Sequence, residues 1–203
     1  MKIKKGKFIT FEGPEATGKS SQIILLKNFL KKNKIPHIIT REPGGTKISE
    51  ILRKLILDHN SNLSNLEEIL LLMTARSNHI NNIILPNLRK GKIVISDRFS
   101  DSTFVYQGYV NNYGIDNCKK LHKILLNNFN PDLTFLFNLS IKEIIKRLKK
   151  RKIKNKYDKI NYRFHNKVID GYSKISKSNR YIHIDASLNK LLIHKKIINT
   201  LKL

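Results

Sequence analysis

The sequence has a single cysteine, and this scarcity limits what the protein can be. Cys118 has no partner for an internal disulfide, and no group of Cys and His has the spacing of zinc ligands. No apolar run is long enough to span a bilayer. The start, MKIKKGKFITF, is basic and then apolar, but its apolar part is short, so we expect a first strand rather than a signal peptide. These features favour a protein of the reducing cytoplasm without a membrane segment.

Acidic residues are also scarce: 15 Asp and Glu stand against 40 Lys and Arg, a formal net charge of +25. Such an excess is typical of nucleic-acid-binding proteins. However, the lysines are spread along the chain, and Lys, Ile and Asn are abundant together, as AT-rich codons would produce. We therefore favour a solvated basic surface with no specific nucleic-acid partner. Such a surface would still attract anionic nucleotides.

Apolar runs typical of strands alternate with runs of helical periodicity. Five strands are predicted in KFITFEG, HIIT, GKIVISDR, DLTFLFNL and RYIHID. Helices are predicted over 19–32, 46–58, 66–89, 141–151, 158–176 and 188–201, and 100–128 should be mostly helical with a break near NNYG. This alternation predicts an α/β fold with a mostly parallel sheet, helices on both faces and ligands at the carboxyl ends of the strands. A length of 203 residues favours one domain, 1–203, with at most a small movable appendage.

A phosphate-binding loop follows the first strand, because GPEATGKS matches G-x-x-x-x-G-K-S. Its glycines let backbone N–H groups turn toward phosphates. Lys19 would reach the β- and γ-phosphates, and the Ser20 hydroxyl would bind Mg²⁺. The next helix adds its N-terminal dipole. The loop residues predicted to bind the nucleotide are Gly13, Pro14, Glu15, Ala16, Thr17, Gly18, Lys19 and Ser20.

Charged residues end the second and third strands. Asp97 and Arg98 follow the apolar KIVI, where an acid can hold Mg²⁺ through water and an arginine can clamp a phosphate. The loop REPGGT combines a fixed proline with flexible glycines. All of these motifs fall at carboxyl ends of strands, as a single site requires.

FEGPEATGKS, TREPGGT, LMTAR, SDRF and STFVYQG, in this order, together with NPDLTFLFNL and the basic segment after it, resemble bacterial thymidylate kinase. The resemblance covers essentially the whole chain, and the combination of REPGG, DR and YQG is its specific part. It implies transfer of the γ-phosphoryl group of ATP to dTMP, giving dTDP, with Mg²⁺. It also implies the five-stranded parallel sheet of a P-loop nucleoside monophosphate kinase, a mobile basic lid at about 147–160, and a homodimer.

The resemblance also assigns the acceptor site. It implies that Glu15 turns away from ATP and accepts a hydrogen bond from the sugar 3′-hydroxyl. Arg76 would then hydrogen-bond the thymine, Tyr106 would pack against the deoxyribose, and Arg98 would contact the acceptor phosphate. The other matched positions are two polar residues near the base, two residues that floor the pocket, and two arginines within reach of phosphate: Thr103, Gln107, Glu42, Pro43, Arg41 and Arg53.

The catalytic charge is predicted to come from outside the phosphate loop, because no basic residue lies between Gly13 and Gly18. The resemblance implies that lid arginines supply it in such sequences. We predict that Arg147 or Arg151 reaches ATP, as a catalytic residue beside Lys19 and Arg98. Asp185 and Ala186, after the fifth strand, resemble the loop that lines the adenine.

Two positions depart from the family pattern. Leu72 stands where an aromatic residue often stacks on the thymine, and NKYD replaces the D-R-x-E of the lid, with Asn155, Lys156 and Asp158 at the aligned positions. Leucine supplies apolar area but no ring stacking, so a kinase for another nucleoside monophosphate is the main alternative. A nucleic-acid-binding P-loop protein and a decayed enzyme are further alternatives, and intact Lys19 and Ser20 argue against the last.

Overall fold

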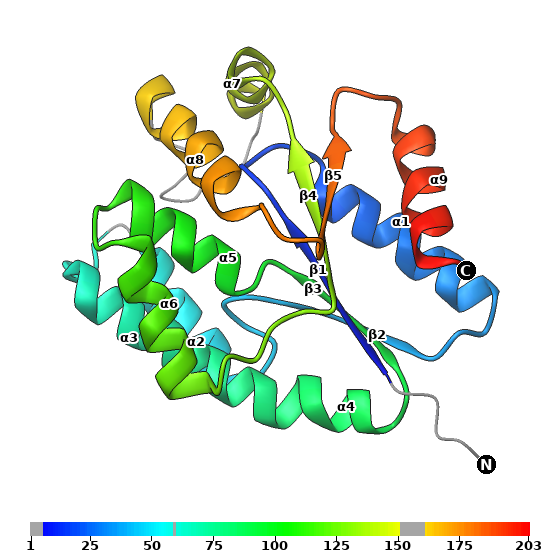
Figure 1. The fold of residues 1–203 in the computed structure, drawn as a ribbon, viewed down its shortest axis with the longest axis horizontal. Coiled ribbons are helices and arrows are strands. Elements are labelled where there is room, and N and C mark those ends of the chain that lie inside the picture. The colour runs from blue at the N-terminus through cyan, green and yellow to red at the C-terminus, as the bar shows by residue number, and fades with distance from the viewer. Residues whose placement is uncertain (1–5, 59, 151–160) are drawn as a thin grey trace.

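A five-stranded, fully parallel sheet forms the centre of the computed structural model, which describes residues 6–58, 60–150 and 161–203 (Figure 1). The strands lie in the order β2-β3-β1-β4-β5. They are β1 (Lys7–Glu12), β2 (His37–Arg41), β3 (Ile93–Asp97), β4 (Leu133–Asn138) and β5 (Tyr181–Asp185). The predicted fold class is therefore confirmed, including all five strands.

Helices occupy the predicted connections between the strands. They are α1 (Lys19–Lys32), α2 (Lys47–Leu57), α3 (Asn65–His79), α4 (Leu85–Arg89), α5 (Ser100–Thr103), α6 (Ile115–Leu126), α7 (Ile141–Lys149), α8 (Tyr162–Ile175) and α9 (Lys190–Leu201). Two π-helical segments, η1 (Ile80–Ile84) and η2 (Phe104–Val110), join α3 to α4 and extend α5. The predicted break near NNYG lies between η2 and α6.

The sheet is covered on both faces because alternate side chains of each strand enter different cores. Ile9 and Ile95 pack with α1 and α9, whereas their neighbours Phe8 and Val94 pack with α3, η1 and α6. Figure 1 shows α1 and α9 on one side of the strands and α3 and α6 on the other. The continuous apolar character of these strands follows from this double burial.

The predicted helix 66–89 is one helical path, but it contains the π-helical segment Ile80–Ile84. Pro86 explains the irregularity, because a proline in a helix interior has no N–H for the regular hydrogen bond and its ring crowds the preceding turn. At the start of α3, Ser64 and Glu67 form a capping box. The helix predicted from 158 instead begins at Tyr162, with Asn161 as its N-cap.

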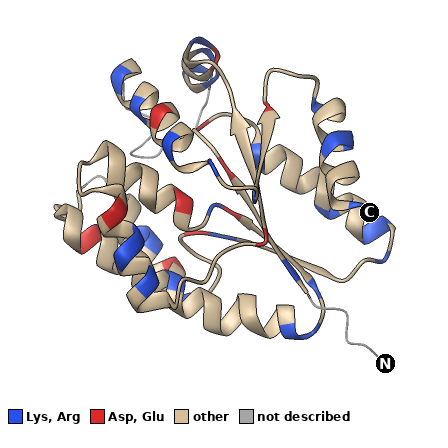
Figure 2. Cartoon of the chain, in the orientation of Figure 1, with Lys and Arg blue, Asp and Glu red and all other residues tan. Residues whose placement is uncertain are grey.

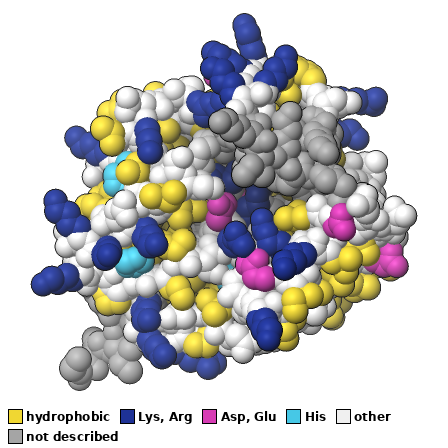
Figure 3. All heavy atoms as spheres, turned by 180° about the vertical axis from the view of Figure 1, so that it is seen from behind, with side chains coloured by type: hydrophobic (Ala, Val, Ile, Leu, Met, Phe, Trp, Pro, Cys, Tyr) yellow, Lys and Arg dark blue, Asp and Glu magenta, His cyan; other side chains and the backbone are white. Residues whose placement is uncertain are grey.

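Charge is distributed around the molecule rather than gathered on one helix. Figure 2 shows Lys and Arg on helices around the whole sheet, including α1, α7, α8 and α9. On the face shown in Figure 3, basic and acidic side chains gather around a hollow in the middle of the molecule. In the part of the chain that the structure describes, no helix has both the length and the apolar character needed to cross a membrane.

Candidate active site

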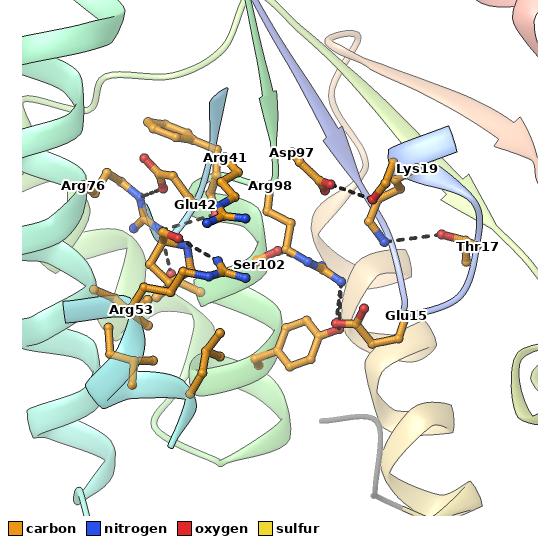
Figure 4. Close-up of a pocket in the computed structure, with 18 of the residues that line it drawn as sticks. Glu15, Thr17, Lys19, Arg41, Glu42, Arg53, Arg76, Asp97, Arg98 and Ser102 are labelled. Atoms are coloured by element: carbon orange, nitrogen blue, oxygen red, sulfur yellow. Dashed lines mark hydrogen bonds and ion pairs between the residues drawn. The ribbon is translucent and has the colours of Figure 1, made fainter. Parts of the chain in front are cut away.

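A cavity of about 530 Å³ lies at the carboxyl ends of β1, β2 and β3 (Figure 4). Its walls come from the phosphate loop, from the loop after β2, and from α2, α3, α5 and η2. It brings together most of the residues that the sequence singled out: Glu15, Ala16, Thr17, Gly18, Lys19, Ser20, Arg41, Glu42, Pro43, Arg53, Leu72, Arg76, Asp97, Arg98, Thr103, Tyr106 and Gln107. Parallel strands place their carboxyl ends together, which explains why motifs far apart in the sequence meet here.

The phosphate loop wraps around the ammonium group of Lys19. This Nζ donates to the carbonyl oxygens of Gly13 at 3.0 Å and Pro14 at 2.7 Å. Burial and the nearby Arg98 lower the pKa of Lys19 to about 8. Glycine is required at the start of the loop, because a Cβ on Gly13 would lie 2.5 Å from the carbonyl oxygen of Phe137. The loop therefore approaches β4 more closely than another residue would allow.

Ser20 and Asp97 join the first turn of α1 to the end of β3. The Ser20 hydroxyl donates to Oδ2 of Asp97 at 2.9 Å. Asp97 lies beside Phe11 in the register of β1 and β3, which places its carboxylate next to the phosphate loop. Both groups offer the oxygen ligands that Mg²⁺ prefers. Among the described residues no group of three or more His, Cys, Asp or Glu forms a metal site, so phosphate oxygens and water would have to supply the other ligands.

Arg98 is the most connected side chain at the centre of the cavity. Its backbone has a φ of 71°, a left-handed conformation that turns the residue out of β3. Nη2 donates to Oε1 of Glu15 at 2.7 Å, and Nη1 donates to Gly13, Ser102 and Tyr172, each at 3.0 Å. Glu15 therefore points toward Arg98 across the cavity, as Figure 4 shows.

Arg76 lies buried at the far end of the cavity. Its Nε donates to Oε2 of Glu42 at 2.7 Å, and its Nη2 donates to Thr103 at 2.9 Å. Burial acts to raise the pKa of Glu42, but Arg76 and His79 together bring it below its usual value. The carboxylate is therefore charged and forms a buried ion pair with Arg76.

The wall next to Arg76 combines polar and apolar side chains. Gln107 donates from Nε2 to Oε1 of Glu68 at 3.1 Å. Leu72 lines the cavity together with Ile56 and Leu57, so this part of the wall is aliphatic. The Tyr106 hydroxyl donates to Glu15 at 3.4 Å. The cavity thus offers hydrogen-bonding groups next to an aliphatic surface, as small-molecule sites commonly do.

Two further arginines, both predicted to be within reach of phosphate, border the opening. Arg41 forms an exposed ion pair with Glu50, with Nη2 and Oε2 separated by 2.9 Å. The Nη1 of Arg53 donates to the carbonyl oxygen of Pro43 at 2.7 Å. Burial and the charge of Arg41 lower the pKa of Arg53. Both side chains add positive charge to the cavity.

The predicted adenine side lies apart from this cavity. Arg147 donates to the carbonyl oxygens of Ala16 at 3.4 Å and Ala186 at 3.1 Å, and so joins the phosphate loop to the end of β5. Asp185 instead accepts two hydrogen bonds from Ser187 and borders a smaller cavity beside Pro14. Arg151 and the lid positions Asn155, Lys156 and Asp158 lie outside the described residues.

A family model described as Thymidylate kinase matches residues 11–197. The chain belongs to the thymidylate kinase family. It is 41% identical to a thymidylate kinase of Rickettsia bellii (strain OSU 85-389) over 205 residues, covering 100% of this chain and 98% of the relative. A thymidylate kinase of Thermoanaerobacter sp. (strain X514) is 38% identical over 200 residues, covering 98% of each chain. The crystal structure of thymidylate kinase from Ehrlichia chaffeensis matches with a TM-score of 0.75 and 32% identity, over 97% of this chain and 98% of that one.

This member of the thymidylate kinase family also has a buried acid beside the site, Glu12, that was not predicted from the sequence. Glu12 accepts hydrogen bonds from the Phe99 N–H, the Ser102 hydroxyl and the Tyr172 hydroxyl, at 2.7, 2.7 and 2.8 Å. Burial, together with the nearby Asp101, raises the pKa of Glu12 to about 7. The sequence did offer one signal for Glu12, because an acid that directly continues the apolar run FITF is expected to be buried with the strand.

Proposed function

We propose that this protein transfers the γ-phosphoryl group of ATP to dTMP, giving dTDP for dTTP synthesis. The observation that carries the proposal is one cavity lined by the phosphate loop at one end and by Arg76, Thr103 and Gln107 at the other. Phosphoryl transfer needs both substrates held in line within such a space. Membership of the thymidylate kinase family supports dTMP as the acceptor.

On the donor side, the phosphate loop, Lys19, Ser20 and Asp97 hold Mg·ATP. Lys19 Nζ lies on the carbonyl oxygens of Gly13 and Pro14, from which it can turn to donate to phosphate oxygens. Ser20 and Asp97 fit Mg²⁺, which binds one or two protein oxygens and otherwise phosphate and water. Mg²⁺ held by these residues would supply positive charge to the phosphates of the nucleotide. Asp185 and Ala186 border the adenine.

On the acceptor side, Arg98 holds the phosphate of dTMP, and Arg41 and Arg53 add positive charge at the rim. Glu15 accepts a hydrogen bond from the 3′-hydroxyl, and Tyr106 packs against the deoxyribose. The acceptor phosphate is already an anionic nucleophile, so the reaction requires no general base from the protein. Positioning and electrostatic stabilisation are sufficient for this chemistry.

We further propose that residues 1–203 form one kinase domain with a lid segment at about 147–160. Arg147 and Arg151 of this segment supply positive charge to the migrating phosphoryl group. The position of Arg147, next to the carbonyl oxygen of Ala16, supports this role. A cytoplasmic location without a specific nucleic-acid partner completes the proposal.

We also infer a homodimer. The helices α2 and α3 pack against each other, and both expose large aliphatic side chains. These are Ile48, Ile51, Leu55, Leu66 and Leu70. A second copy that covered them would remove this apolar surface from water. Light scattering after size-exclusion chromatography should give the mass of two chains, and Ile51→Asp should reduce it to one.

The decisive test is ADP release by the purified protein with Mg·ATP and either dTMP, dUMP, UMP or dCMP. We expect turnover to depend on dTMP. It should fall by about 10³-fold in Lys19→Ala, because the lysine side chain is proposed to contact the transferred group. Similar rates with several acceptors would leave the phosphoryl transfer standing and overturn dTMP as the substrate. No acceptor-dependent ADP release would overturn the kinase itself.

A further inference from the structure

A buried hydrogen-bond network adjoins Arg76, at the end of the cavity where the base is proposed to bind. His79, the last residue of α3, is completely buried. Its Nδ1 lies 2.8 Å from Oε1 of Glu42, and its Nε2 lies 2.6 Å from the hydroxyl of Thr40. His79 is not among the residues that line the cavity, whereas Glu42 and Arg76 are. Its contact with any acceptor would therefore be indirect.

We propose that His79 is a positioning residue for the acceptor base, which acts through Glu42 to fix the guanidinium group of Arg76. The proposal rests on the proposed function for its kinetic consequence, but the geometry that it describes is a property of the protein alone. Glu42 divides its oxygens between the two partners: Oε1 faces His79, and Oε2 accepts from Nε of Arg76 at 2.7 Å.

As a result, two nitrogens of the Arg76 guanidinium group are held by strong acceptors, and the third donates to a weak acceptor. Nε is bound by Glu42, and Nη2 by Thr103 and the carbonyl oxygen of Phe99. Among the described residues, Nη1 donates to Sδ of Met73 at 3.7 Å, which is a weak acceptor. Nη1 is therefore the nitrogen that suits a carbonyl oxygen on a pyrimidine ring. Its direction depends on the two contacts that hold the rest of the group.

The orientation of His79 is itself fixed by its surroundings. A carboxylate can only accept, so Nδ1 must carry a hydrogen toward Glu42, and Nε2 faces the Thr40 hydroxyl. Gly45 closes the other side, because a Cβ at that position would lie 2.7 Å from Nε2. Arg76 and His79 are three residues apart on α3 and so lie on the same side of the helix. The network thus ties the end of β2 to α3.

Removal of the imidazole should weaken the binding of dTMP and leave the binding of ATP unchanged. We expect His79→Leu, which replaces the imidazole with an apolar side chain, to raise the KM for dTMP about tenfold, since a hydrogen bond to a charged group is lost. The KM for ATP should stay unchanged, and kcat should change less than the KM for dTMP. His79→Asn places an amide N–H near the position of Nδ1 and should restore much of the affinity. His79→Gln extends its amide toward the position of Nε2 and should not.

A double-mutant comparison separates positioning from general stability. In an Arg76→Ala background, His79→Leu should have no further effect on the KM for dTMP, because the group that it positions is gone. His122→Leu is the matched control: His122 is equally buried but lies on α6, where its Nε2 contacts the carbonyl oxygen of Phe129. It should lower the melting temperature without a selective effect on dTMP.

A measurement without substrate distinguishes failure of this proposal from failure of the proposed function. The Nε–Hε signal of Arg76 in an NMR spectrum, assigned by its loss in Arg76→Ala, should exchange slowly with water in the unaltered protein. In His79→Leu it should exchange faster, while His79→Asn should retain slow exchange. Equal protection in His79→Leu, or an equal rise in the KM for dTMP with and without Arg76, would overturn the positioning role.

Discussion

Nη2 of Arg98 donates to Oε1 of Glu15 at 2.7 Å, and this contact explains why a loop that binds anions contains an acid. The carboxylate lies against a guanidinium group that neutralises its charge. Charge compensation lets it remain next to the phosphate loop. In the proposed function, Glu15 is thereby held where the sugar hydroxyl of the acceptor would donate to it.

The first prediction concerns the 3′-hydroxyl of dTMP, which is proposed to donate a hydrogen bond to Glu15. Glu15→Gln should raise the KM for dTMP about tenfold, because a hydrogen bond to a charged acceptor contributes roughly 1.5–3 kcal/mol. The KM for ATP should change little. With 3′-deoxy-dTMP, which lacks the hydroxyl, the unaltered enzyme and the variant should have similar KM values. A tenfold difference with that analogue as well would show that Glu15 acts on something other than the 3′-hydroxyl.

The second prediction concerns Arg147, which contacts the carbonyl oxygens of Ala16 and Ala186. Arg147→Ala should lower kcat by about 10³-fold if its charge acts on the migrating phosphoryl group. Lys146→Ala is the control, since Lys146 is the preceding residue of α7 but is exposed and paired with Glu143. Steady-state kinetics at saturating ATP tests this. Equal kcat values for the two variants would remove Arg147 from the reaction.

The third prediction concerns the pH dependence of stability and Glu12. Burial raises the pKa of this carboxyl from 4.5 to about 7, so between these values the folded state binds a proton that the unfolded state does not. The contribution of Glu12 to the unfolding free energy should therefore be greatest below pH 4.5 and decrease as pH rises through 7. Urea unfolding between pH 4.5 and 8 should show a weaker decrease for Glu12→Gln than for the unaltered protein.

The control for this experiment is Asp116→Asn, because that carboxyl is exposed at the start of α6. Its unfolding free energy should follow that of the unaltered protein across the same pH range. A Glu12→Gln profile parallel to the unaltered one would mean that the Glu12 carboxyl has similar proton affinity in both states.

The fourth prediction concerns the aliphatic wall of the cavity, where the base is proposed to bind. Leu72→Phe introduces a ring that can stack on the pyrimidine, and aromatic pairs contribute about 0.5–1.5 kcal/mol beyond the buried area. The KM for dTMP should therefore fall about two- to tenfold, with an unchanged KM for ATP. Calorimetric titration with dTMP measures the affinity directly. Weaker binding would mean that the neighbouring Ile56 and Leu57 leave no room for a ring at position 72.

Local sequence predicted the parts of the site whose geometry is local. GPEATGKS specifies its own loop, because glycine placement and the following helix determine where the backbone N–H groups point. The helix predicted over 46–58 is present as α2 (Lys47–Leu57), and the Thr46 side chain caps it by accepting from the Ser49 N–H. The start of α8 was less predictable, because Asp158 and Tyr162 both fit a helical pattern and the cap at Asn161 decides between them.

The sequence by itself determined the order of strands and helices along the chain, the phosphate loop, and the edge of the sheet at which the motifs meet. Periodicity and glycine placement act on neighbouring residues, so they can be read along the chain. Only the tertiary structure decided which side chains meet within the site. Tyr172 and Glu12 are 160 positions apart and share a hydrogen bond, and Glu42 joins two residues of α3 from the end of β2. These pairings depend on the order of the strands in the sheet and on side-chain packing, and no local pattern encodes either.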